Sequence, residues 1–187
     1  MPSDEESMLA VGQGDLNAFE GIVIRHQRTA WQIAYRFLGD AAEAEDVAQD
    51  AFLKLLAAAP RYRPSASFRT FFYRIVSRLC IDRSRKMKPI YLDQVPDVPD
   101  PQPDASDRMA SAERTLAIRR AMDALPSNQR MAIVLRHYDE LDYRSIAETM
   151  GITEKAVKRL LARGREHMRH SLANLLADAP REGDFPC

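Results

Sequence analysis

Cysteine is scarce in this sequence, with Cys80 and Cys187 the only two in 187 residues. Their spacing fits neither a zinc site nor a disulfide framework, so a reducing compartment, the cytoplasm, is expected. Long apolar runs are also missing. A membrane helix needs about 20 apolar residues in a row, and no stretch of the sequence approaches that length. The acidic start, Met-Pro-Ser-Asp-Glu-Glu, lacks the apolar core of a signal peptide. We therefore expect a protein that is neither secreted nor inserted in a membrane.

The chain also lacks the residue groups of an enzyme that acts on nucleic acid. The sequence contains no evident carboxylate cluster, metal-ligand set or glycine-rich phosphate loop. His167 and His170 lie three residues apart, but a metal site needs three or four ligands and no third ligand is evident. We expect no catalytic activity, no metal and no cofactor.

The net charge is zero, but the charge is unevenly distributed along the chain. Residues 16–88 hold thirteen Lys/Arg against seven Asp/Glu, and residues 108–173 hold thirteen against eight. The compensating acidic residues lie in 1–15, 89–107 and 174–187. Because salt screens charge beyond about 8–10 Å, local positive surface is what a polyanion meets. The sequence thus predicts two basic domains, 16–88 and 108–173, with an acidic N-terminal tail and a C-terminal tail.

The segment between the two basic domains, 89–107, is predicted to be a linker. It contains five Pro, five Asp and no Lys or Arg, a composition that favours extended chain. It is either a simple tether or an acidic strand that mimics nucleic acid in a positively charged channel of a partner.

Residues 142–165 have the pattern of a helix-turn-helix that reads DNA. Apolar residues form a stripe on each of two short helices, Gly151 provides the turn, and Thr153 is a good N-cap for the second helix. The opposite face of the second helix is basic and suits the major groove. The residues predicted to contact duplex DNA are Thr153, Lys155, Lys158, Arg159 and Arg163. The alternative is a surface helix whose charges are only solvated.

The first domain is also predicted to be helical, with helices over 16–38, 41–58 and 68–86. Gly39 ends the first helix, and Asp40 is a candidate N-cap for the second. The core stripe of the second helix leaves four residues on other faces: Asp46, Gln49, Asp50 and Leu53. These residues form either a docking surface for a protein or a solvated patch.

The helix predicted over 68–86 interleaves aromatic and basic residues. Bases offer π-faces and nucleotides offer phosphates, so aromatic side chains beside cations suit unpaired nucleic acid. The same pattern also fits an aromatic core stripe with solvated arginines. The candidate residues for unpaired DNA are Phe72, Tyr73, Arg74 and Arg78, together with Arg63 in the preceding loop.

Several motifs together resemble those of sigma-70-family RNA polymerase sigma factors of the small extracytoplasmic-function (ECF) type. They are Asp-Val-Ala-Gln-Asp-Ala-Phe-Leu (46–53), Phe-Arg-Thr-Phe-Phe-Tyr-Arg-Ile-Val (68–76), Ile-Asp-Arg-Ser-Arg (81–85), Ala-Leu-Pro-Ser-Asn-Gln-Arg (124–130) and the helix-turn-helix. The resemblance implies an all-α fold with two small helical domains joined by the acidic, proline-rich linker.

The resemblance also implies partners and roles. The patch of Asp46, Gln49, Asp50 and Leu53 would bind the bacterial core RNA polymerase. The helix over 68–86 and its preceding loop would melt and read the downstream promoter element, and the helix-turn-helix would read the upstream element. The resemblance further implies an anti-sigma factor as a partner. At Arg78 and at Arg159-Leu160 the chain departs from residues common in the family, so the promoter sequence does not follow from the resemblance.

Two other classes of protein remain as alternatives. A free-standing helix-turn-helix regulator would use residues 142–165, but it leaves the aromatic-basic helix and the acidic linker without a role. A sigma mimic that recruits an anti-sigma factor would share the fold, and it would differ by failing to bind core polymerase.

Overall fold

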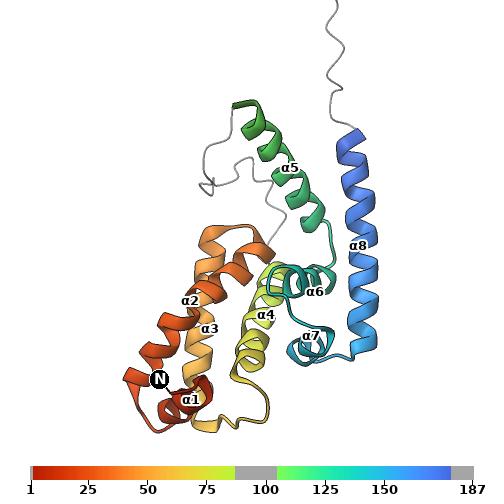
Figure 1. The fold of residues 1–187 in the computed structure, drawn as a ribbon. Coiled ribbons are helices and arrows are strands. Elements are labelled where there is room, and N and C mark those ends of the chain that lie inside the picture. Colours follow the sequence, from red (N-terminus) through yellow and green to blue (C-terminus); the bar gives the residue numbers. More distant parts are fainter. Residues whose placement is uncertain (1, 87–104, 178–187) are drawn as a thin grey trace, which may run out of the picture.

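The described part of the chain is helical, as the sequence predicts. The computed structural model describes residues 2–86 and 105–177, with side chains described for 2–86 and 113–173, and these residues include no β-strand. Eight α-helices follow one another in Figure 1, with a short 3-10 turn, η1, after the third. The elements are α1 (Asp4–Gly12), α2 (Leu16–Leu38), α3 (Ala41–Ala58), η1 (Ala59–Arg61), α4 (Phe68–Lys86), α5 (Ala105–Asp123), α6 (Ser127–His137), α7 (Tyr143–Met150) and α8 (Glu154–Ala177).

Capping residues set the ends of the helices in the first half of the chain. Asp40 Oδ1 accepts a hydrogen bond from the backbone N–H of Glu43 at 2.9 Å, which starts α3. Ser67 Oγ accepts from the backbone N–H of Thr70 at 3.2 Å in the first turn of α4. Gly39 ends α2 with φ at 78°, in the left-handed region that glycine adopts without a Cβ penalty. The predicted helices 16–38, 41–58 and 68–86 are therefore confirmed.

Aromatic rings form much of the core of the first half. Helices α2, α3 and α4 pack on one another around fully buried Phe37, Phe68 and Phe72. The rings of Phe68 and Phe72 stack with centroids 5.8 Å apart, and Phe52 of α3 lies 5.2 Å from Phe72. Offset and tilted ring pairs add to the stabilisation from apolar burial.

The first fifteen residues, predicted to be an acidic tail, instead contain helix α1. Met8 is fully buried against the core. Asp4 pairs with Arg25 Nε of α2 at 2.9 Å, and Glu5 Oε1 accepts from the backbone N–H of Phe68 at 2.7 Å. The acidic residues thus attach α1 to α2 and cap the start of α4, which composition alone did not reveal.

The second half of the chain contains the predicted helix-turn-helix in α7 and α8. Asp142 caps α7 by accepting from the backbone N–H of Ser145 at 2.7 Å, and Gly151 ends it with φ at 67°. Thr153 Oγ1 accepts from the backbone N–H of Ala156 at 3.2 Å and caps α8. Helix α6 packs against both, and α5 packs against α8. Residues 89–104 of the predicted linker lie outside the described residues, and α5 begins at Ala105.

A glycine allows α8 to approach α6 closely. A Cβ added to Gly164 would lie 2.8 Å from Ile133 Cδ1, closer than side-chain carbons approach. The glycine costs up to about 1 kcal/mol of helix propensity against alanine. A side chain at this position would require the Ile133 side chain of α6 to shift.

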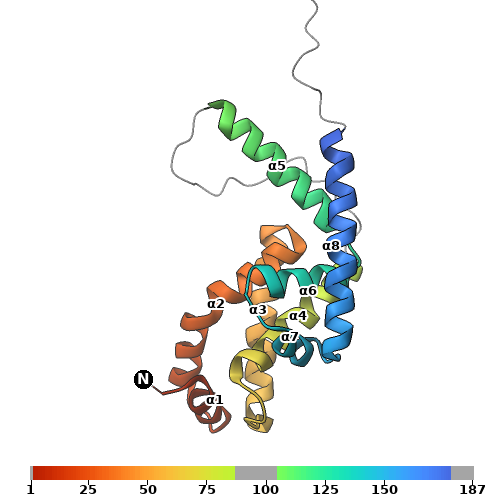
Figure 2. The same ribbon diagram turned by 45° about the vertical axis from the view of Figure 1, so that its right-hand side comes forward.

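The two halves of the chain lie against each other. Helix α7 packs along α4, and α6 contacts both α4 and α2. Figures 1 and 2 show α6 and α7 beside α4 in both views, while α5 and the far end of α8 extend away from the first half. The arrangement brings the two segments predicted to bind DNA, α4 and the helix-turn-helix, into one body.

Candidate nucleic-acid and protein interfaces

Helix α3 presents a mixed polar and apolar face to solvent. Asp46, Gln49, Asp50 and Leu53 are all exposed, and the Leu53 side chain has 64% of its surface open. Residues spaced by three and four lie on one side of a helix, so these four form a continuous strip. The strip thus places one large exposed apolar side chain, Leu53, among three polar ones, and all four residues are open to solvent. We call this strip the α3 face.

Arg83 of α4 braces one end of the α3 face. Its guanidinium forms ion pairs with Glu43 and Asp46 at the start of α3. Hydrogen bonding to Glu43 is the main cause of a raised pKa for the Arg83 guanidinium, with a smaller contribution from Asp46. Asp46 is therefore partly neutralised within the chain, whereas Asp50 and Leu53 remain open to a partner. Sequence reasoning missed Arg83, because no periodicity links it to α3.

Phe72 is a core residue and is not placed to contact DNA. Its side chain is fully buried, stacked on Phe68 one helical turn away and packed against Phe52. A base cannot reach this ring while the core of the first half is intact. The prediction that Phe72 binds promoter DNA is therefore corrected, because the ring serves the alternative role of an aromatic core stripe.

Tyr73 and Arg74 lie on the side of α4 that faces the second half. Tyr73 is 5% exposed, and its hydroxyl donates to Asp139 Oδ1 at 3.4 Å. Burial is the largest cause of the raised pKa of the Tyr73 hydroxyl, so the phenol stays protonated as a donor. Arg74 Nη2 donates to the backbone carbonyl of Glu148, near the end of α7, at 2.6 Å. Both candidate DNA residues are engaged by residues of the second half.

Arg63 and Arg78 are more open than Tyr73 and Arg74. Arg63 lies exposed in the loop before α4, and its Nη1 donates to the carbonyl of Tyr62 at 3.0 Å. Arg78 is exposed on α4, one turn beyond Arg74. These two guanidinium groups are available to phosphates in the observed arrangement.

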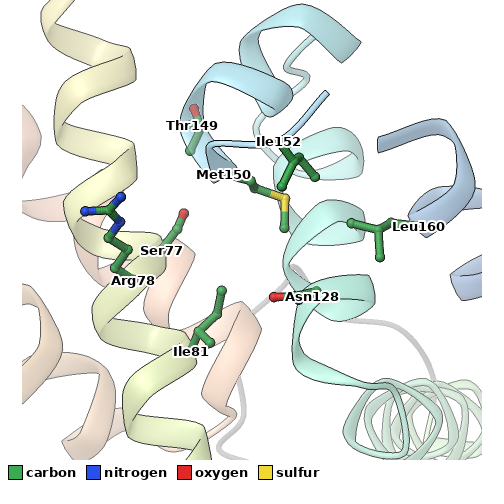
Figure 3. A pocket seen from close by; sticks show the side chains of 8 residues that line it. All are labelled: Ser77, Arg78, Ile81, Asn128, Thr149, Met150, Ile152 and Leu160. Carbon is green, nitrogen blue, oxygen red and sulfur yellow. The ribbon is translucent and has the colours of Figure 1, made fainter. Parts of the chain in front are cut away.

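A cavity of about 110 Å³ lies between the two halves beside Arg78. Figure 3 shows Ser77 and Ile81 of α4 on the side toward the second half, while the Arg78 guanidinium points to the other side of α4. The second half contributes Asn128, Thr149, Met150, Ile152 and Leu160. Ser77 Oγ and Thr149 Oγ1 are buried without a hydrogen-bond partner among the described residues. The contact between the halves is thus imperfectly packed and imperfectly hydrogen-bonded at this point.

Helix α8 presents a basic face that is exposed to solvent. Val157 and Leu161 are buried toward α6 and α7, which turns the basic side chains outward. The residues predicted to contact duplex DNA are all exposed: Thr153, Lys155, Lys158, Arg159 and Arg163. Lys158 Nζ lies 5.9 Å from the ring centroid of Tyr143, which places it above α7. We call these five residues the α8 face.

Two arginines at the contact between the two halves were not among the residues predicted from the sequence. Arg69 Nη2 donates to the backbone carbonyl of Asp139 at 3.0 Å, and its guanidinium lies 5.1 Å from the Tyr73 ring centroid. Arg36 of α2 lies over the Tyr138 ring at 4.7 Å. Arg69 lies four residues before Tyr73 on α4, as Arg74 lies four residues before Arg78. The same helical spacing could therefore have identified Arg69 from the sequence.

The described residues contain neither a membrane-spanning helix nor a cluster of metal ligands. Across 2–86 and 105–177, no helix is long and apolar enough to cross a membrane. Within the same described segments, no three His, Cys, Asp or Glu side chains come together as metal ligands. His167 and His170 are exposed on α8.

Comparison with protein families finds two matches in the order that the motifs suggest. The family model described as sigma-70 region 2 matches residues 22–89, and sigma-70 region 4 matches residues 115–168. The first match covers most of α2 and all of α3 and α4, and the second covers the end of α5, all of α6 and α7, and most of α8.

Relatives match along most of the chain. ECF RNA polymerase sigma factor SigW of Bacillus subtilis is 36% identical over 88% of this chain and 94% of its own length. ECF RNA polymerase sigma factor SigM of Mycobacterium tuberculosis is 32% identical over 92% of this chain and 86% of its own.

Solved structures show the same fold at lower identity. CnrH in complex with the cytosolic domain of CnrY aligns with a TM-score of 0.68 at 23% identity, over 95% of this chain and 100% of that one. The sigma factor RpoE, in complex with the anti-sigma factor NepR from Bartonella quintana, aligns with a TM-score of 0.58 at 17% identity, over 87% and 98%. With both sigma-70 regions in order and curated relatives matched over nearly their whole length, the chain belongs to the ECF RNA polymerase sigma factors.

Proposed function

We propose that this protein binds bacterial core RNA polymerase, directs it to a specific set of promoters and assists opening of the DNA. The proposal depends on one observation. This ECF sigma factor has both an exposed apolar and acidic face on α3 and an exposed basic face on its helix-turn-helix. The first suits a protein surface, and the second suits duplex DNA. The chain would act as an initiation factor and not as an enzyme.

Each surface has a separate proposed role. The α3 face would bind the polymerase, chiefly through Asp50 and Leu53, because Asp46 is already paired with Arg83. The α8 face would bind the upstream promoter element in the major groove. Tyr73 and Arg74 of α4, with exposed Arg63 and Arg78, would bind the separated strand of the downstream element.

The proposed domain boundaries follow the charge blocks of the sequence. Residues 16–88 would be the polymerase-binding and strand-binding domain, and 108–173 the duplex-binding domain, with 89–107 as linker. The matches to sigma-70 regions over 22–89 and 115–168 support this division. Helix α1 extends the first domain at its N-terminal side, since it packs on α2 and caps α4.

An anti-sigma factor is proposed as a second protein partner. The support is that a solved structure with the same fold is a sigma factor in complex with the anti-sigma factor NepR.

We also propose a cytoplasmic location. Cys80 is buried, and burial raises the pKa of its thiol far above the usual range, so Cys80 does not serve as a reactive redox sensor in the observed fold.

Size-exclusion chromatography with purified core RNA polymerase tests the proposed function. The wild-type chain is expected to co-elute, and Asp50→Arg is expected to weaken co-elution, because it places a cation where the α3 face offers a carboxylate. Glu20→Arg, the same charge change at an exposed residue of α2, is the control. A wild-type chain that elutes alone but shifts duplex DNA would instead support a free-standing regulator.

A further inference from the structure

The loop that precedes α4 belongs to the part of the chain proposed to bind the downstream promoter strand. We call residues 62–67 the 62–67 loop, and all of them except Tyr62 are exposed. Two of its hydrogen bonds are local. The backbone N–H of Ser65 donates to the Arg63 carbonyl at 2.8 Å, and Arg63 Nη1 donates to the Tyr62 carbonyl at 3.0 Å. Bonds between sequence neighbours shape the loop but do not fix it on the molecule, so its position depends on how its two ends are held.

Helix α1 packs against the start of the 62–67 loop. It contacts η1, which leads into the loop. At Gly12, the last residue of α1, an added Cβ would lie 2.6 Å from the Ala59 carbonyl oxygen, so the two backbones touch. Tyr62 is 4% exposed, and its ring centroid lies 5.2 Å from that of Phe71 on α4. The first end of the loop is therefore fixed by packing on α1 and α4.

Glu5 of α1 holds the other end of the 62–67 loop. Its Oε1 accepts a hydrogen bond at 2.7 Å from the backbone N–H of Phe68, the first residue of α4. The first N–H groups of a helix have no partner within the helix, and the helix dipole favours a carboxylate there. Ser67 provides a local cap for Thr70, whereas Glu5 reaches the same turn from 63 residues away. One acidic side chain thus joins the end of the loop to α1.

The hydroxyl of Tyr62 shows that Glu5 also acts on the first end of the loop. Burial is the largest cause of the raised pKa of the Tyr62 hydroxyl, followed by the negative charges of Glu5 and Asp4. Tyr62 Oη is buried without a hydrogen-bond partner among the described residues. Glu5 therefore acts on the first residue of the loop and bonds to the residue that follows the last one.

Helix α1 is attached to α2 at several points, so it can support the loop. Asp4 Oδ1 accepts from Arg25 Nε at 2.9 Å, and Asp4 Oδ2 lies 2.8 Å from His26 Nε2. Ser7 Oγ accepts from Arg25 Nη2 at 3.2 Å, and Met8 is fully buried. These contacts place α1 on the core of the first half, and the loop is held by α1 in turn.

We propose that α1 positions the 62–67 loop for the bases of the downstream promoter element, with Glu5 as the positioning residue that joins the two. The inference rests on the proposed function, because it takes the loop and α4 as the surface for the separated strand. The match to sigma-70 region 2 begins at residue 22, so it includes the loop but not α1. Phosphate contacts carry no sequence information, whereas base readout needs closely placed groups. Loss of Glu5 therefore reduces base preference more than affinity.

Amide hydrogen exchange, followed by NMR on the full chain, tests whether Glu5 holds the loop. Glu5→Ala is expected to speed exchange of the Phe68 amide at least about tenfold, because hydrogen bonds to charged groups are the stronger class. Asp15→Ala is the matched control, since Asp15 Oδ1 caps α2 by accepting from the N–H groups of Asn17 and Ala18. It should speed exchange at those two amides and leave Phe68 within about twofold. An unchanged Phe68 amide in Glu5→Ala would overturn the inference.

Selection from a duplex DNA library with a random segment tests whether the position of the loop sets base preference. Core RNA polymerase with the wild-type chain is expected to enrich two sequence elements among heparin-resistant complexes. Glu5→Ala is expected to weaken the preference among bases severalfold in the downstream element and to leave the upstream element unchanged. The upstream element is an internal control, because α8 lies on the opposite side of the molecule from α1 in both views (Figures 1 and 2).

Glu5→Gln separates positioning from a general loss of stability. The amide keeps an oxygen acceptor of the same shape without the charge, so it should restore much of the downstream preference that Glu5→Ala loses. Asp15→Ala, which also removes a capping carboxylate, should keep the full preference. Equal losses in Glu5→Ala and Asp15→Ala would show a general effect of stability and overturn the inference.

The two measurements keep this inference apart from the proposed function. A wild-type chain that enriches no sequence with core polymerase would remove the proposed function. Exchange at the Phe68 amide would still decide whether Glu5 holds the loop, because it is measured on the free chain. Enrichment by the wild-type chain, together with an unchanged downstream preference in Glu5→Ala, would keep the proposed function and remove the inference.

Discussion

The side of α4 that holds Arg69, Tyr73 and Arg74 and the α8 face are both basic and helical, yet only the α8 face is open to solvent. On α8 the residues predicted to contact DNA are all exposed, because Val157 and Leu161 turn the other side of the helix into the core. On α4 the Tyr73 ring is covered and Arg74 is bonded to the end of α7. A pattern of charges can therefore identify a candidate nucleic-acid surface, but it does not establish that the surface is open.

The largest expected effect concerns the buried side of α4. Phe72→Ala removes a fully buried ring from the core, and truncation of a buried phenylalanine costs about 3–5 kcal/mol. We expect the free energy of unfolding in urea to fall by that amount. Arg78→Ala, an exposed residue on the same helix, should change it by less than about 0.5 kcal/mol. Similar small changes in both variants would mean that Phe72 is not a core residue, and the division of α4 into buried and DNA-facing sides would fail.

A smaller effect compares the two basic faces in duplex binding by the free protein. Arg159→Ala removes an exposed cation from the α8 face and should lower the slope of log affinity against log salt by about 1. Arg74→Ala should leave the duplex affinity and its salt slope unchanged, because Arg74 is bonded to Glu148. Fluorescence anisotropy over 50–200 mM salt measures both. An equal loss from Arg74→Ala would show that α4 is open in the free protein.

The smallest expected effect is a pH dependence of the contact between the two halves. Burial raises the pKa of the Asp139 carboxyl above its ordinary 3.8, while Arg36, Arg69 and Tyr73 act in the lowering direction. A raised pKa means that the protonated carboxyl favours the packed arrangement. That support is complete below about pH 3.8 and is lost as the pH rises through the raised value. At neutral pH the ionised carboxylate therefore opposes closure.

Small-angle X-ray scattering between pH 4 and 7 measures this pH dependence. We expect the radius of gyration to increase slightly as the pH rises, and Asp139→Asn to remove the increase. Asp139→Asn should thus favour the packed arrangement of the two halves, and Asp139→Lys should oppose it. A pH response that survives in Asp139→Asn would place its origin in another group.

Much of the fold could be predicted from local signals in the sequence. Asp40 and Thr153 indicate helix starts, and Gly39 and Gly151 indicate helix ends, because caps depend on residues close in sequence. Apolar periodicity located the buried sides of α2, α3 and α8. Helix α1 was missed because an acidic segment resembles a solvated tail. Its contacts, the ion pair of Asp4 with Arg25 and the hydrogen bond from the backbone N–H of Phe68 to Glu5, appear only in the folded chain.

The candidate sites were predictable to a lesser degree. On α8 the basic residues and the apolar stripe fall on opposite sides, so exposure followed from spacing alone. On α4 the aromatic residues lie on more than one side, and spacing could not separate Phe72 in the core from Tyr73 beneath α7. Arg83 and Arg69 were missed because their partners are about 40 and 70 residues away in the sequence.

The sequence by itself determined the helices, the basic character of both halves and the family motifs, because these depend on residues within a few turns of one another. Only the tertiary structure decided which basic face is available. The carbonyls of Asp139 and Glu148 reach Arg69 and Arg74 because α7 packs along α4, and that packing joins residues that no local pattern connects. Burial and hydrogen bonding between the two halves are properties of the folded chain. They determine whether a basic residue is exposed, whereas composition determines only its charge.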